Sequence, residues 1–303
     1  MQQDKLGRID RAKINDLKEG YPIENNPYES LIVDITGRCN MNCNFCYYPE
    51  RSLPDMSAEY FENVCARLPA PVYIRLAGGE PTLHPDLINF LRIAVKYGHT
   101  AYIGSNGLKY ADPAFMDPLK EAKESGVPFH LGFSMDGGHS NNLAYETING
   151  EDCLKQKLVA FDSLVSYKIG RVCLSAIIVR GLNEDVIPQL VELADRHQDI
   201  VRYIHFRNAA KVGAWENTEP YSIDELKRLV KQFFSEDEFR QRCIAEVHCP
   251  PESGKECCYR FRPTKRLQIS IIEFASERSS RCPRRGRLVL GRNKIQPLFD
   301  SMK

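Results

Sequence analysis

From residue 31 onward, short apolar runs alternate with longer amphipathic stretches. The runs are typical of buried strands, and the stretches between them repeat their apolar residues every three to four positions, as helices do. The predicted strands are 31–36, 72–77, 100–104, 128–134, 171–179 and 201–206. The predicted helices lie near 57–68, 86–97, 113–125, 151–168, 184–197 and 222–240.

This alternation predicts an α/β fold in which helices cover a parallel sheet. Six strand-helix repeats are too few for a closed eight-stranded barrel, and right-handed crossovers curl them into a partial (β/α)6 TIM-like barrel. We expect three parts: a polar N-terminal segment (1–30), a core (31–215) and a C-terminal cysteine-rich extension (216–303). Loops at the carboxyl ends of such strands gather at one mouth, where sites usually lie.

Composition narrows the class of protein. The 303 residues are 43% hydrophobic and 27% charged with a net charge of +1, and no apolar run approaches the roughly 18 residues that span a bilayer. The N-terminus lacks the apolar stretch of a secretory signal, so we expect a cytoplasmic protein. Eleven cysteines in such a chain indicate metal ligation or reduced thiols rather than disulfides.

Three of these cysteines, Cys39, Cys43 and Cys46, share the loop that follows strand 31–36. Three thiolates on an iron-sulfur cube leave one iron open to a small molecule. Buried thiols or a zinc site are the alternatives, but no His follows at zinc-finger spacing, and Cys65 falls in a helical stretch. We interpret Cys65, Cys153 and Cys173 as structural thiols.

The spacing Cys-x3-Cys-x-aromatic-Cys after a hydrophobic strand resembles the signature of the radical SAM enzymes. This resemblance implies a 4Fe-4S cluster held by Cys39, Cys43 and Cys46, whose open iron is chelated by S-adenosylmethionine (SAM). It also implies that Phe45 flanks the adenine, that the reduced cluster cleaves SAM to a 5'-deoxyadenosyl radical, and that a flavodoxin- or ferredoxin-type protein donates the electron.

A second motif, Gly78-Gly79-Glu80, follows strand 72–77. Two glycines let the backbone approach a ligand closely, and a carboxylate can accept hydrogen bonds from an ammonium group. The motif resembles the Gly-Gly-Glu segment that binds the SAM amino group in this family. Taken alone, it is typical of a tight turn.

Polar residues also end the next two strands. Asn106 and Ser134 can hydrogen-bond a ribose or a carboxylate, and Asp136 follows closely. These segments resemble strand ends of the MoaA- and SPASM-like branch, although Asn and Asp beside Gly also simply make turns. One departure is Glu146, which stands where peptide-maturing relatives commonly carry an Arg.

The sixth strand ends near Arg207, which we expect to face the mouth and to offer a fork for a carboxylate or phosphate. His205 is more typical of a structural histidine. Farther on, Cys249, Cys257, Cys258 and Cys282 could hold an auxiliary iron-sulfur cluster, a zinc ion or nothing. Residues 259–294 carry eleven Lys and Arg against two Glu, which suits an acidic small substrate, nucleic acid or a solvated face.

The resulting hypothesis is a radical SAM enzyme that abstracts hydrogen from an anionic biosynthetic small molecule. Oxidation, epimerisation, decarboxylation and bond formation all remain open as outcomes, and the sequence does not name the substrate. One alternative is a radical SAM maturase of a ribosomal peptide. Another, from a different class, is a non-catalytic metal- or RNA-binding module. We expect no membrane partner and no nucleic-acid partner.

Overall fold

The computed structural model describes residues 20–44, 46, 51–209, 219–235, 258–264, 266–272, 285–288 and 291–297. Its strands are β1 Tyr21–Pro22, β2 Ser30–Thr36, β3 Tyr73–Gly78, β4 Thr100–Ser105, β5 Phe129–Ser134, β6 Val172–Ile178, β7 Val201–Asn208, β8 Cys258–Phe261, β9 Gln268–Ile272, β10 Arg285–Leu288 and β11 Lys294–Pro297. Its helices are α1 Ala58–Arg67, α2 Leu87–Lys96, α3 Pro113–Glu124, α4 Asn142–Ala144, α5 Leu154–Ser166, α6 Val186–Arg196 and α7 Ile223–Lys231.

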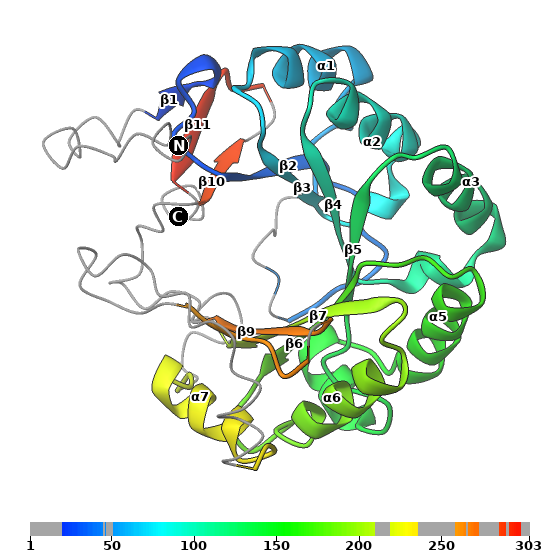
Figure 1. The fold of residues 1–303 in the computed structure, drawn as a ribbon, viewed down its shortest axis with the longest axis vertical. Coiled ribbons are helices and arrows are strands. Elements are labelled where there is room, and N and C mark those ends of the chain that lie inside the picture. The colour runs from blue at the N-terminus through cyan, green and yellow to red at the C-terminus, as the bar shows by residue number, and fades with distance from the viewer. Residues whose placement is uncertain are drawn as a thin grey trace, which may run out of the picture.

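These strands form one sheet in the order β1-β11-β10-β2-β3-β4-β5-β6-β7-β9-β8. The strands from β10 to β9 are parallel, and β11 and β8 pair antiparallel outside them. The sheet curls, its helices lie around the outside, and it stays open between its edges (Figure 1). This confirms the partial α/β barrel. The six predicted strands are all present, and β9 and β10 extend the parallel run from the C-terminal segment.

Parallel register brings the carboxyl ends of the strands to one edge. Leu76 of β3 pairs with Val33 of β2 and with Ile103 of β4, so the loops after these strands leave the sheet side by side. Residues that follow Thr36 and Gly78 are therefore neighbours in space. The mouth expected from the sequence is formed at this edge.

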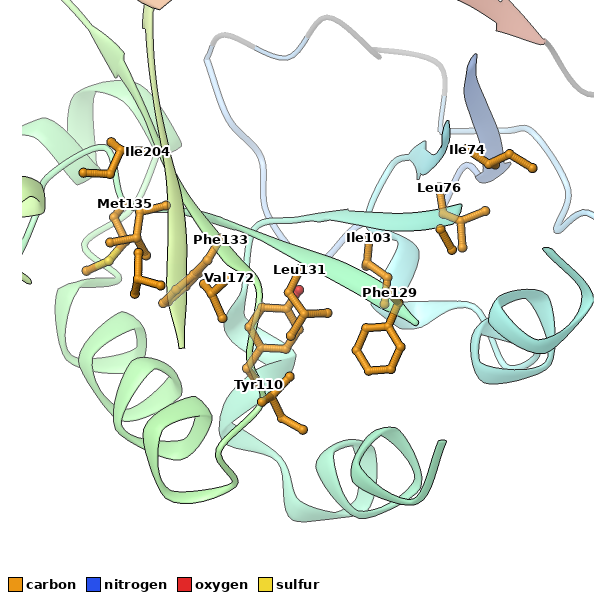
Figure 2. Close-up of a cluster of buried hydrophobic side chains, with 14 of the residues drawn as sticks. Ile74, Leu76, Ile103, Tyr110, Phe129, Leu131, Phe133, Met135, Val172 and Ile204 are labelled. Carbon is orange, nitrogen blue, oxygen red and sulfur yellow. The ribbon is translucent and has the colours of Figure 1, made fainter. Parts of the chain in front are cut away.

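The main core lies between the sheet and its outer helices. Alternate strand residues face it, and Figure 2 shows Ile74, Leu76, Ile103, Phe129, Leu131 and Phe133 in this layer. Phe133 stacks on Phe161 of α5 with ring centroids 6.4 Å apart. The opposite face of the same strands carries polar side chains, among them Arg75, Tyr102 and Arg207. The barrel interior is therefore polar and suits a polar ligand.

A buried ion pair joins the C-terminal segment to the strand before the cysteine loop. Both Nε and Nη2 of Arg287 on β10 lie 2.7 Å from Oδ2 of Asp34 on β2, with side-chain exposures of 5% and 1%. Removing one partner of such a pair leaves a buried charge without compensation. Arg285 also turns inward, to the cavity described below. Part of the basic run is therefore interior, and the solvated-face interpretation fails for these two arginines.

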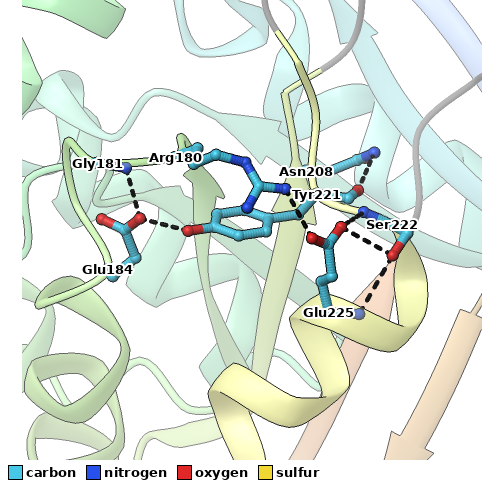
Figure 3. Close-up of polar contacts among 7 residues, drawn as sticks. All are labelled: Arg180, Gly181, Glu184, Asn208, Tyr221, Ser222 and Glu225. Carbon is cyan, nitrogen blue, oxygen red and sulfur yellow. Dashed lines mark hydrogen bonds and ion pairs between the residues drawn. The ribbon is translucent and has the colours of Figure 1, made fainter.

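Helix α7 is fastened to the barrel by a polar network (Figure 3). Ser222 and Glu225 form the predicted capping box, and Arg180 Nη2 lies 2.9 Å from Glu225 Oε1. The Arg180 guanidinium also covers the Tyr221 ring at 4.1 Å. The helix ends at Lys231 rather than at the predicted 240, because the chain turns there and packs Phe234 edge-to-face on the β8 side of the sheet. Residues 236–240 lie outside the described part of the chain.

This network predicts a pH-dependent contribution to stability. The Ser222 N–H, the Arg180 guanidinium and the Ser222 hydroxyl lower the pKa of Glu225 to about 2 from its ordinary 4.5. Because the folded-state pKa is the lower one, the stabilisation is complete above pH 4.5 and is lost as the pH falls towards 2. We expect Glu225→Gln to cost about 1 kcal/mol at pH 7, as the loss of a helix cap does.

The measurement is urea unfolding of both proteins at pH 7, 5 and 3. The difference between wild type and Glu225→Gln should shrink between the last two values, whereas Glu121→Gln, an exposed change on α3, should have no effect at any of them. A difference that stays constant from pH 7 to 3 would contradict this role for the Glu225 carboxylate.

Candidate active site

A cavity of about 250 Å³ lies inside the barrel and reaches the carboxyl ends of the strands. Its lining contains every residue predicted for the cluster and SAM that the structure describes: Cys39, Cys43, Cys46, Gly78, Gly79, Glu80, Asn106 and Ser134. Asp136 and Arg207 line it as well. Phe45 lies outside the described residues. Four loops separated by up to a hundred residues in sequence thus meet at one space.

Two N–H donors point at the cysteine thiols. Asn149 Nδ2 lies 3.6 Å from Cys43 Sγ, and Arg51 Nη2 lies 3.9 Å from Cys46 Sγ. Arg51 also donates to the Met41 carbonyl at 3.0 Å, which fixes it against the loop. Burial raises the pKa of Cys43 to about 11. N–H donors around sulfur stabilise negative charge on it, as the outer hydrogen bonds of thiolate metal centres do.

Asn149 is held in place by Asp136. The Asp136 carboxylate accepts from the Ile177 N–H at 2.8 Å through Oδ1 and from Asn149 Nδ2 at 3.2 Å through Oδ2. Asn149 ends a short π-helix, Tyr145–Asn149, of the kind often found at functional sites. Sequence reasoning missed Asn149 and looked for a cation near Glu146, which is exposed on this π-helix. Burial raises the pKa of Asp136.

The Gly78-Gly79-Glu80 segment is bound to the start of the cysteine loop through its backbone. Gly79 N donates to the Thr36 carbonyl at 2.8 Å, and Glu80 N donates to the Arg38 carbonyl at 2.7 Å. A Cβ on Gly79 would lie 2.2 Å from the Arg38 oxygen, and Gly78 has φ of +117°. Only glycine permits this approach at both positions.

The Glu80 carboxylate is buried and connects two strand ends. Its Oε1 accepts from the Thr82 N–H, the Thr82 hydroxyl and the Ser105 hydroxyl at 3.0, 2.6 and 2.8 Å, and its Oε2 accepts from Asn106 N at 2.7 Å. Burial raises the pKa of Glu80, and these four bonds partly offset that effect. Oε2, with one partner, is the oxygen that keeps room for a further donor.

The Asn106 side chain bridges to the cysteine loop. Its Nδ2 donates to Asn40 Oδ1 at 2.8 Å, while its Oδ1 accepts from the Leu108 N–H at 3.0 Å and closes a turn. Asn106 thus makes a turn and also lines the cavity, and its role in binding a ligand stays a prediction.

A buried lysine, which sequence reasoning placed on a helix without a role, supports the two polar strand ends. Lys157 of α5 has 0% exposure, and its Nζ donates to the carbonyls of Asn106 and Ser134, the latter at 3.0 Å. The same ammonium lies 5.6 Å from the Phe133 ring centroid. It also lies close enough to Cys43 to lower the pKa of that thiol, against the larger effect of burial.

We expect Lys157→Met to destabilise the chain by about 1–3 kcal/mol, because two buried carbonyls lose a charged donor at nearly unchanged side-chain volume. Urea unfolding measures this. Lys155→Met, on the exposed side of the same helix, is the control and should change stability by less than about 0.5 kcal/mol. Equal effects of the two changes would contradict the role given to Lys157.

The remaining cysteines divide into two groups. Cys65, Cys153 and Cys173 are buried, as expected of structural thiols. Of the four cysteines considered for a second metal site, Cys258 is half-buried at the start of β8, and Cys249, Cys257 and Cys282 lie outside the described residues. That second site stays a prediction.

Residues 33–194, more than half of the chain, match the radical SAM superfamily. The chain belongs to this superfamily. Its members use a 4Fe-4S cluster and SAM, which makes the chain an enzyme with these cofactors.

Two curated relatives are each 28% identical. A 7,8-dihydro-6-hydroxymethylpterin dimethyltransferase from Methanocaldococcus jannaschii matches over 190 residues, 60% of this chain and 36% of its own length. A GTP 3',8-cyclase from Aquifex aeolicus matches over 229 residues, 69% of this chain and 66% of its own length. This chain thus spans between about a third and two thirds of these relatives.

Among solved structures, Streptococcus suis SuiB bound to the precursor peptide SuiA has a TM-score of 0.62 at 14% identity, covering 96% of this chain and 63% of that one. At this identity the likeness supports the fold. The described helices are too short or too polar to cross a membrane.

The donor set was tested against the family's cofactors. No three His, Cys, Asp or Glu side chains in the described residues are grouped to hold a single metal ion. A cluster does not require that grouping, since each of its thiolates binds a different iron. Three thiols on one cavity, with N–H donors on two of them, fit an iron-sulfur cluster.

Proposed function

We propose that Cys39, Cys43 and Cys46 hold the 4Fe-4S cluster and that SAM binds beside it at the ends of β3, β4 and β5. The observation that carries this proposal is the meeting of the three thiols with Gly78, Glu80, Asn106 and Ser134 on one cavity. When bound, the reduced cluster and SAM together supply a 5'-deoxyadenosyl radical that abstracts hydrogen from an unactivated carbon.

In this proposal the chain's own residues orient the cofactors and hold charge. Arg51 and Asn149 donate N–H groups to the thiolate sulfurs, and Asp136 fixes the amide of Asn149. The glycine backbone lies flush against the cysteine loop, and Glu80 Oε2 offers an acceptor to the SAM ammonium group. Phe45, between Cys43 and Cys46, would flank the adenine.

The proposed substrate is an anionic biosynthetic small molecule. Arg75 and Arg207 line the cavity, which supports negative charge on the ligand. The names of the two relatives describe enzymes of GTP and of a pterin, both small molecules, and this also favours the proposal. The runner-up substrate is a ribosomal peptide, favoured only by the peptide-bound SuiB structure among the similar folds.

Three further parts of the proposal follow from family resemblance. Residues 31–215 would be the catalytic core, and 216–303 an extension that could carry an auxiliary cluster. The described strands of that extension pair with both edges of the core sheet, at β7 and β2. A flavodoxin- or ferredoxin-type protein would deliver the electron.

The experiment is a screen of fractionated metabolite extracts for SAM-dependent deuterium transfer. Reconstituted protein is incubated with SAM, reductant and extracts from cells grown on deuterated carbon sources, and 5'-deoxyadenosine is analysed by mass spectrometry. Deuterium carried by an anionic low-molecular-weight fraction supports the proposal. Transfer found only with the peptide fraction would replace it by the runner-up, and transfer from none of the fractions would contradict both.

A further inference from the structure

The same cavity is also lined by arginines from three strands. Arg75 lies on β3, Arg207 on β7 and Arg285 on β10, and all three line the cavity. The two carboxylates that line the cavity, Glu80 and Asp136, already accept hydrogen bonds from backbone, hydroxyl and amide donors. The cavity therefore holds three guanidinium groups as well as the three thiols.

Two of these arginines, Arg75 and Arg207, lie near the same groups. Arg75 pairs across the sheet with Tyr102 of β4, and its guanidinium carbon lies 4.6 Å from the centroid of that ring. Arg75 and Arg207 both act on the Tyr102 hydroxyl and on the Cys173 thiol, where their charges favour the ionised forms. Side chains that start on opposite sides of the barrel thus reach the same groups.

His205 lies two residues before Arg207 on the same face of β7, close enough to the arginines to be affected by their charge. Burial lowers its pKa well below the ordinary value, and Arg207, Arg75 and Arg285 lower it further. The ring is neutral at neutral pH, and its Nδ1 has no hydrogen-bond partner among the described residues. The imidazole therefore adds no positive charge beside these arginines.

Two glycines leave space in the cavity because they have no side chain. Gly104 and Gly132, at inward positions of β4 and β5, line the cavity. A Cβ on Gly132 would lie 2.3 Å from the Tyr102 hydroxyl, so that hydroxyl rests directly on the β5 backbone. A Cβ on Gly104 meets only ordinary contacts, with the Leu76 oxygen at 3.5 Å nearest. A side chain at 104 therefore begins without a clash, and a large one would extend into the cavity.

We propose that Arg75, Arg207 and Arg285 bind a phosphate or carboxylate group of the substrate. This inference rests on the proposed function, because it takes the cavity as the substrate site. Arg75 and Gly78 are three residues apart on β3, which is about 10 Å along the strand. The carbon that loses hydrogen lies between the arginines and the cysteine loop.

The test is calorimetric titration of full-length reconstituted protein with inorganic phosphate, pyrophosphate and malonate. Wild type is compared with the double variant Arg75→Gln/Arg207→Gln and with a charge-matched control, Arg92→Gln/Arg196→Gln, whose arginines are exposed on α2 and α6. We expect the cavity variant to weaken anion binding about tenfold or more and the control to leave it unchanged. Tighter binding of a phosphate probe indicates a phosphate ester, and tighter malonate binding indicates a carboxylate.

Three results would overturn the inference: wild type binds none of the three anions, the two double variants bind equally, or saturating SAM abolishes anion binding and so assigns the arginines to SAM. If the cavity variant does not fold, Gly104→Ile replaces it and must abolish binding. Two measurements distinguish failure of this inference from failure of the proposed function. They are titration of the same anions into iron-free protein and SAM cleavage by the reconstituted wild type. If the reconstituted wild type does not cleave SAM but the anions still bind, only the proposed function is contradicted.

Discussion

Replacing Cys39, Cys43 and Cys46 together by alanine is expected to remove the cluster that the reconstituted protein holds. Wild type should bind about four iron atoms and about four sulfides per chain at this site, and the variant close to none. The reason is that the predicted cluster is attached to the chain only through these thiolates. The N–H donors of Arg51 and Asn149 contact sulfur and cannot bind iron themselves.

Iron and sulfide analysis after anaerobic reconstitution is the measurement. Cys65→Ala removes a buried thiol of α1 in the outer core and should keep the wild-type iron content. An auxiliary cluster in the extension would leave a second set of about four irons in the triple variant, still well below wild type. Iron content that is the same in the triple variant and in wild type would refute the assignment of the three ligands.

The second large effect is expected at Gly79, where a single methyl group should disrupt the site. A Cβ there would lie 2.2 Å from the Arg38 carbonyl oxygen and 2.7 Å from that of Gly37, both backbone atoms that cannot rotate away. The cysteine loop or the end of β3 must shift. We expect a cost of about 1–3 kcal/mol in stability, as for overpacking, and a loss of SAM cleavage of about 100-fold, as for a displacement near 1 Å.

Gly79→Ala is compared with Gly170→Ala by urea unfolding and by 5'-deoxyadenosine formation. Gly170 is a matched control because the nearest atom to its built Cβ is the Asp199 oxygen at 3.8 Å, an ordinary contact. If Gly79→Ala resembles Gly170→Ala in both assays, the close approach of the two loops does not matter for cofactor binding.

The sequence was informative where a signal is local. Apolar periodicity located all six core strands within one or two residues of their observed ends, and it also located the helices that cover them. Helix α5 begins three residues later than predicted because Gly150, at φ of +79°, ends the preceding π-helix. The motifs at Cys39 and Gly78 were recognisable because their spacing and their place after a strand are both properties of neighbouring residues.

Residues that depend on distant contacts were missed. The run Arg285-Gly286-Arg287 is a parallel strand only because it pairs with β2, more than 250 positions earlier, and Arg287 finds Asp34 there. The run is mostly basic, so it lacks the apolar pattern that indicates a strand. Lys157 was missed for the same reason. Helix periodicity does not show that this lysine of α5 faces two strand-end carbonyls while Lys155 faces solvent.

The central claim, that the cysteine end of the cavity binds SAM at an iron-sulfur cluster, is tested most directly by reductive cleavage of SAM without any substrate. Reconstituted wild type, reduced under anaerobic conditions, should form 5'-deoxyadenosine, and the Cys39/Cys43/Cys46→Ala variant should form none. No 5'-deoxyadenosine from wild-type protein that carries its full iron and sulfide, or equal amounts from wild type and variant, would contradict the claim.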